Sequence, residues 1–174
     1  MAAKNKETVP LGERLEMHRT KKEARELASL YPPLLNRKLQ HKCIEYLMEL
    51  DAVSEIAELF PDLGDLGLQE DCIDFLIKEG ADDELVRIVE QIPAYSIQER
   101  CVDYFIRVGD TKTLADIGEY VDEDELKMAC IDFLVDCGEG YAAVGIAETA
   151  SQDVREYTVG LLLDHGFYEE SEEL

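Results

Sequence analysis

The chain has 174 residues, and its 40 Asp and Glu against 17 Lys and Arg give a formal charge of −23 at pH 7. Hydrophobic residues make up 46 %, which is typical of a folded chain. No apolar run approaches the roughly 20 residues of a membrane span, and so acidic a body repels nucleic-acid phosphates and anionic membranes. We therefore expect no membrane association, and we expect no secretion signal in Met1–Leu11.

The charge is unevenly distributed along the chain. The first 42 residues hold ten Lys or Arg and five Glu, a net +5, whereas the remaining 132 residues carry a net −28. The N-terminal end is therefore predicted to be a basic docking segment for RNA or for an acidic protein surface. The alternative is a solvated end helix whose charge favours its acidic neighbours. The predicted binding residues are Arg14, Arg19, Lys21, Lys22, Arg25, Arg37 and Lys38.

From Cys43 onwards the sequence repeats with a 29-residue period. Each copy reads Cys, an aliphatic residue, an acidic residue, an aromatic residue and a large apolar residue. A degenerate fifth copy begins at Thr158, 28 residues after the fourth. The four clear copies begin at Cys43, Cys72, Cys101 and Cys130.

Each repeat predicts two helices, because apolar residues recur at the i, i+4 and i+7 spacing of one helical face. Glycine after the first helix tolerates the left-handed conformation that ends a helix, and an Asp then follows as a candidate cap. The same register extends backwards, so Lys21–Tyr31 is predicted to be the second helix of an earlier unit, after a short helix at Leu11–His18. The glycines are Gly80, Gly109, Gly138 and Gly166, and the candidate caps are Asp51, Asp82 and either Asp110 or Thr111.

The predicted fold is all-α, because no segment alternates with the period of a strand. Helix pairs bury their apolar faces only by stacking, which predicts an α-solenoid of about five two-helix repeats. The predicted ranges are a flexible tail at 1–10, the solenoid at 11–166 and an acidic C-terminal tail at 167–174. Within the solenoid, 11–38 is the basic end unit and 39–166 holds the acidic repeats. The last unit is expected to lack a second helix, and its Glu-rich tail to fray.

The repeat resembles the short HEAT-like repeats, also called phycobilisome-lyase-type repeats. The resemblance is carried by the Cys-containing amphipathic helix, the turn Gly109-Asp110 and the second helix with its Leu-x-x-Ile pattern, and it covers most of Leu39–Gly166. The alanine-rich second half of the family pattern is weak here, and the Arg before the first helix appears only as Arg100 and Arg155. The resemblance implies a scaffold or binding surface and no particular activity.

Four of the five cysteines share one repeat position, so their spacing should follow that of stacked helices, about 8–10 Å. That spacing is too long for a disulfide, and a row of thiols does not converge on one metal ion. We expect free thiols that pack as small apolar groups, in a reducing compartment, and we place the protein in the cytoplasm. No metal or cofactor is predicted.

An acidic stripe recurs at the repeat period on the exposed side of the first helices. We interpret it as a surface that receives basic residues from a partner, with a solvated helix face inherited by duplication as the alternative. Reversing its charge should weaken binding in a salt-dependent way. The stripe consists of Glu45, Asp74, Asp103 and Asp132.

Catalysis is not predicted. The three histidines share no metal-ligand spacing, and the chain lacks both a nucleophile elbow and a phosphate-binding loop. The sequence therefore favours a non-enzymatic interaction module, an adaptor, assembly factor or accessory subunit, whose acidic surface binds a basic protein. Four alternatives remain open. They are a nucleic-acid mimic that inhibits a nucleic-acid-binding protein, a ribonucleoprotein factor that touches RNA through its basic end, an enzyme or metal carrier, and the general acidity of a salt-adapted proteome. The oligomeric state is left open.

Overall fold

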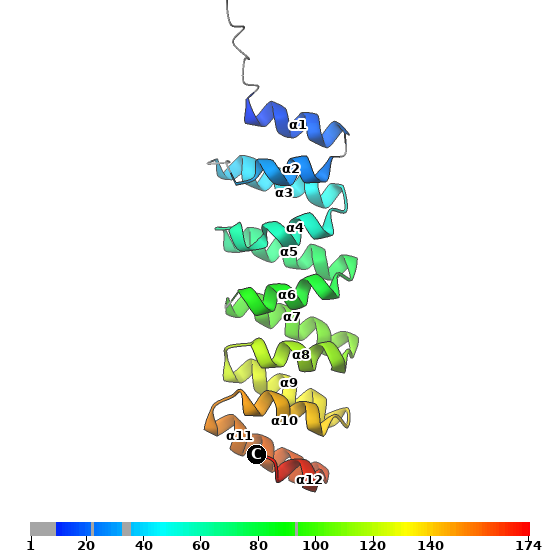
Figure 1. Cartoon of the computed structure of the whole chain (residues 1–174), viewed down its shortest axis with the longest axis vertical. Coiled ribbons are helices and arrows are strands. Elements are labelled where there is room, and N and C mark those ends of the chain that lie inside the picture. Colours follow the sequence, from blue (N-terminus) through cyan, green and yellow to red (C-terminus); the bar gives the residue numbers. More distant parts are fainter. Residues whose placement is uncertain (1–9, 22, 33–35, 93) are drawn as a thin grey trace, which may run out of the picture. The chain divides into compact units, whose positions relative to one another are not determined.

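A computed structural model describes residues 10–21, 23–32, 36–92 and 94–174, and those residues are helical with no strand (Figure 1). They divide into two compact units, 1–68 and 69–174, and α5 (Leu66–Glu79) spans the boundary. The all-α class is confirmed within the described ranges. Residues 1–9 of the predicted tail at 1–10 and the predicted site residue Lys22 lie outside them. No helix in these ranges has both the length and the apolar character needed to cross a bilayer.

The first unit contains two helix pairs in which α1, α2 and α3 all contact one another. Its first helix extends to Lys21, and its second begins only at Ala24, so the expected second helix at Lys21–Tyr31 is shorter than predicted. The helices are α1 (Leu11–Lys21), α2 (Ala24–Leu30), α3 (Arg37–Glu49), α4 (Val53–Leu59) and the 3₁₀ helix η1 (Phe60–Asp62).

In the second unit, even-numbered helices contact one another in order, from α6 to α8, α10 and α12, and so do α7, α9 and α11. Figure 1 shows these two sets as separate layers of the unit. The helices are α6 (Asp82–Gln91), α7 (Tyr95–Val108), α8 (Thr111–Tyr120), α9 (Asp124–Asp136), α10 (Gly140–Glu148), α11 (Gln152–His165) and α12 (Tyr168–Ser171).

The helix ends agree in part with the predicted stop glycines and cap residues. All four predicted glycines have positive φ, from 67° to 90°. Asp110 caps α8 by accepting a hydrogen bond from the Thr113 backbone N–H at 3.1 Å. The caps predicted at Asp51 and Asp82 are wrong, because Ala52 and Ala81 occupy those positions and provide no side-chain oxygen.

The C-terminal residues differ from the expected frayed tail. Tyr168–Ser171 form α12, which contacts both α10 and α11. The preceding Phe167 packs so closely on Gly140 that a Cβ there would lie 3.0 Å from the ring. The contact of this half-buried ring with Gly140 holds the segment, and α12 takes the place of the second helix that the last unit was expected to lack.

Asp51 occupies the position that is glycine in later units. Among the residues that the structure describes, it alone has a positive φ without being glycine, at 53°. An L-residue in this conformation costs about 1 kcal/mol relative to glycine. We expect Asp51→Gly to raise the free energy of unfolding by about that amount, measured by urea denaturation. The matched control is Asp83→Gly in the first turn of α6, which should lower it, since glycine is a poor helix former. A loss of stability in Asp51→Gly would contradict the prediction.

Candidate functional site

The predicted acidic stripe lies on the first helix of four successive pairs. Glu45, Asp74 and Asp103 are exposed, and Asp132 is half-buried. Each therefore has the surface access that the interpretation requires. Their positions on α3, α5, α7 and α9 follow from the repeat register.

Two members of the stripe are bound by the following odd-numbered helix. Asp74 accepts a hydrogen bond from Arg100 Nη1 of α7 at 2.7 Å, and Arg100 Nη2 also contacts Glu70 at 3.3 Å. Asp132 accepts a hydrogen bond from the Tyr157 hydroxyl of α11, and this bond contributes most to raising the pKa of Tyr157 to about 12. These two carboxylates link neighbouring helices within the second unit, so they are less available to a partner than the sequence indicated.

Asp103 lies in a surface hollow of about 330 Å³ between α5 and α7. Arginine interrupts the acidic character of this hollow, since Arg100 binds Asp74 and the Arg107 guanidinium lies 5.8 Å from the centre of the Tyr104 ring. The stripe is therefore a mixed-charge surface around Asp103. The lining residues are Asp74, Ile77, Arg100, Asp103, Tyr104 and Arg107.

The predicted basic end is distributed over three helices. Arg14 is half-buried on α1, the Arg25 side chain is 92 % exposed on α2, and Arg37 and Lys38 are exposed at the start of α3. Arg37 forms an ion pair with Asp65. The side chains of Arg19 and Lys21 lie outside the described part of the structure. Arg37 and Lys38 line a hollow of about 480 Å³ on α3, together with His41, Lys42 and Glu45.

A second acidic row, which we did not predict, lies on α6, α8 and α10. Glu90, Glu119 and Glu148 are exposed and occupy one repeat position in the last turn of these three helices. In the described ranges none of the three carboxylates takes part in a hydrogen bond or ion pair. A carboxylate is unfavourable at a helix C-terminus, where the carbonyl dipoles already concentrate negative potential. At the ends of α8 and α10 this cost is offset, because Lys127 and Arg155 bind the last carbonyls there. The 29-residue spacing of the row could have revealed it from the sequence.

Polar side chains that are buried or half-buried bind the ends of two of these helices, α8 and α10. Gln98 is 1 % exposed, and its Oε1 accepts from the Asp122 backbone N–H just after α8. Lys127 Nζ lies 3.3 Å from the carbonyls of Gly118 and Glu119, at the end of α8. Arg155 binds the carbonyls of Ala147 and Glu148 in the same way, at the end of α10. The register could have revealed this position too, at Gln40, Gln69, Gln98, Lys127 and Arg155.

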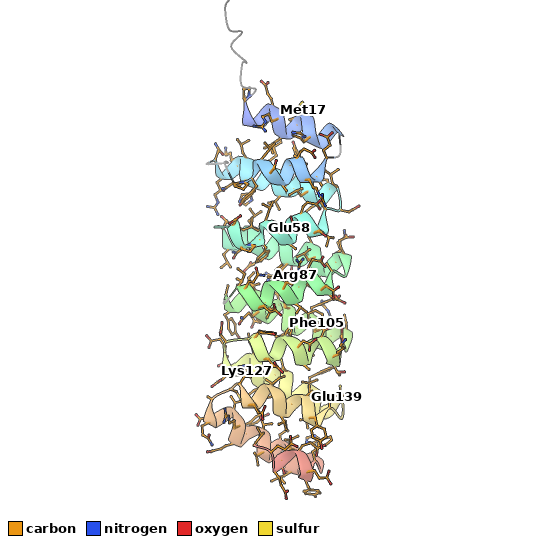
Figure 2. The ribbon with its side chains drawn as sticks, viewed as in Figure 1. Met17, Glu58, Arg87, Phe105, Lys127 and Glu139 are labelled. Atoms are coloured by element: carbon orange, nitrogen blue, oxygen red, sulfur yellow. The ribbon has the colours of Figure 1, made fainter. Side chains whose placement is uncertain are left out.

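Lys127, labelled in Figure 2, is 5 % exposed, and its burial lowers the pKa of the ammonium. It also donates to Thr149 Oγ1 at 2.8 Å. We expect Lys127→Ala to lower the free energy of unfolding by about 1–3 kcal/mol, because the stem and three hydrogen bonds are lost. Lys127→Gln, which copies Gln98, should lose much less, as measured by urea denaturation.

The lowered pKa of Lys127 also predicts that the stability difference between wild type and Lys127→Gln depends on pH. Folding takes a charged Lys127 out of water, so the unfolded chain binds its proton more tightly than the folded chain does. Wild type should gain stability relative to Lys127→Gln as pH rises from the lowered pKa towards 10.5. A constant difference across that range would contradict the burial of a charged amine.

The four repeated cysteines are fully buried, and all five cysteines in the chain are free thiols. Burial raises the pKa of Cys43, Cys72, Cys101 and Cys130 to about 12. Their packing as small apolar groups agrees with the sequence prediction. Cys137, at the end of α9, is exposed.

Among the described residues, no three His, Cys, Asp or Glu side chains gather closely enough to hold a metal ion. Two histidines contact carboxylates, His18 with Glu23 at 3.0 Å and His165 with Asp136 at 3.3 Å. No family model, curated protein or solved structure matches this chain. The resemblance to HEAT-like repeats therefore stays a prediction.

Proposed function

We propose that the protein is a non-enzymatic interaction module, an adaptor, assembly factor or accessory subunit, built as an α-solenoid of HEAT-like helix pairs. Its acidic surface binds a protein with a basic surface. The observation that carries the proposal is the last-turn row Glu90, Glu119 and Glu148, three exposed carboxylates that take part in no hydrogen bond or ion pair among the described residues. Glu119 also interacts electrostatically with the Lys127 ammonium. Five free thiols support a reducing compartment, and we propose the cytoplasm.

The electrostatics favour a partner whose Lys and Arg approach the even-numbered helices. Of the predicted stripe, Asp74 and Asp132 are bound to Arg100 and Tyr157. The last-turn row takes part in no hydrogen bond or ion pair in the described ranges, and it places negative charge at the ends of three helices. Two of these ends, those of α8 and α10, also bind Lys127 and Arg155 through their carbonyls. We therefore propose this row as the main contact, with Asp103 of the same unit as a secondary contact.

The test is affinity isolation from the source lysate at low and high salt, with identification of the bound proteins. A triple variant, Glu90, Glu119 and Glu148 each changed to Gln, should lose basic proteins that wild type retains at low salt. The matched control changes Asp83 and Asp153 to Asn and Glu125 to Gln. This control removes the same charge from exposed first-turn positions of α6, α11 and α9. Equal retention by both variants would overturn the assignment of the row.

A nucleic-acid mimic is the alternative function, and rows of carboxylates at a constant repeat position favour it. The two functions predict different results in a competition assay. A mimic is displaced from its target by DNA or RNA of the kind that the target binds, whereas an adaptor stays bound. RNA retained by the wild-type protein and lost in a variant with Arg37 and Lys38 changed to Glu would instead support the ribonucleoprotein role of the basic end.

A further inference from the structure

The side of α11 that faces away from α9 carries an exposed apolar row. In α9, which contacts α11, Ile131 and Val135 are 0 % and 2 % exposed. Their counterparts 28 residues later are Val159, which is half-buried, and Leu163, which is 44 % exposed. Two positions that are buried in α9 are therefore half-buried and exposed in α11.

Acidic residues surround this apolar row. Glu156 and Asp164 lie on the same helix and are exposed, and Glu156 accepts a hydrogen bond from Gln152 one turn earlier. Residues 152–174 contain seven Asp or Glu, with Arg155 as the sole Lys or Arg. The face therefore suits a helix that offers an apolar side chain beside a positive charge.

The side of α1 that faces away from α3 has both features. In α3, Cys43 donates a hydrogen bond to the Leu27 carbonyl, and the Tyr46 hydroxyl donates to Glu16, so both side chains point towards the preceding helices. The counterparts of these two residues in α1, 29 residues earlier, are Arg14 and Met17. Met17, labelled in Figure 2, is 43 % exposed. Arg14 places a positive charge at the position that cysteine occupies in later units.

We propose that α11 of one copy binds α1 of a second copy, with Met17 against Leu163 and Val159, and Arg14 beside Glu156. The second copy's α1 then takes the place that the next odd-numbered helix would take. The contact joins two different surfaces, so each copy offers one of each, and repeated contacts build either a ring or an open assembly. Two α11 faces placed against each other would instead bring their carboxylates together, which is unfavourable.

Sedimentation velocity at about 0.15 M salt tests the proposal, because the Debye length there, about 8 Å, screens the overall negative charge but not a direct contact. The average mass of wild type should rise between about 10 µM and about 1 mM, the range of weak contacts. Leu163→Glu and Met17→Glu should each raise the dissociation constant at least about tenfold. The matched control is Val108→Glu at an exposed position of α7, 52 % exposed, which should leave association unchanged.

A mixing experiment identifies which faces meet. Leu163→Glu and Met17→Glu, each monomeric alone, should form a 1:1 complex when mixed, since each retains one intact face. Arg14→Glu should weaken association, and combining it with Glu156→Arg should restore it. A monomeric wild type at every concentration overturns the proposal, as does association that Met17→Glu leaves intact. These results are independent of the binding of a basic partner, which depends on the last-turn row.

Discussion

Treatment of the native protein with a chromogenic thiol reagent at pH 8 is expected to modify one cysteine of the five rapidly. Cys137 is exposed, whereas the four repeated thiols are fully buried with pKa values raised to about 12. At pH 8 a thiol with that pKa is ionised in about one molecule in 10,000, and the thiolate is the reactive form. The slow phase should be at least about 1,000-fold slower, because reaction also waits for local opening.

The control for this experiment is Cys137→Ser, which should abolish the rapid phase, while denaturant should make the four remaining thiols react together. A second rapid equivalent in the native protein would contradict the burial of the repeated position. That outcome would also remove the explanation of cysteine as a packing residue between neighbouring helices.

The same burial predicts a loss of stability at alkaline pH. The folded protein keeps the four thiols protonated to about pH 12, whereas the unfolded chain gives up these protons above about pH 9. The raised pKa therefore leaves stability intact below pH 9 and lowers it as pH rises from 9 towards 12. The expected slope approaches about 1.4 kcal/mol per pH unit for each thiol. Replacing Cys101 with Ala should reduce this slope in urea denaturation.

Phe105→Ala is expected to lower the free energy of unfolding by about 3–5 kcal/mol. Phe105, labelled in Figure 2, is 0 % exposed on α7 and occupies the position of Leu47, Leu76 and Leu134. Removing its ring leaves a cavity that the surrounding helices cannot close completely. Thermal and urea denaturation measure the loss.

Phe133→Ala on α9 is the matched control for this substitution. Phe133 occupies the aromatic position of the repeat and is half-buried, so its loss should cost clearly less. Equal losses in the two variants would mean that the burial difference between these repeat positions does not determine stability.

The sequence predicted the helices well because the same apolar spacing and helix-ending residues recur in several copies of the repeat. Left-handed glycines ended α7 and α11 as expected, at Gly109 and Gly166. Two of the errors fall where one copy departs from the others. Asp51 adopts the glycine conformation itself, and Phe167 fixes α12 by packing on Gly140, a contact that no local rule reveals.

The candidate site was less predictable. The stripe was chosen because its members recur at an exposed position, yet Arg100 and Tyr157 reach Asp74 and Asp132 from the next helix of the layer. The last-turn row has the same periodicity, but its meaning depends on where each helix ends and on the lack of a partner in the described ranges. Helix ends are placed by caps and packing, so the sequence pattern alone did not separate this row from other surface acids.

The sequence alone determined the all-helical class, the 29-residue register, the division of charge into +5 and −28, and the residue types of the core. These properties follow from local periodicity and composition, and the same pattern recurs in each copy of the repeat. Only the tertiary structure decided which carboxylates are bound and which are unpaired, because pairing depends on side chains that approach from about 25–30 residues away. It also showed that the outer side of α11 exposes Leu163, since exposure depends on which neighbouring helix covers a face.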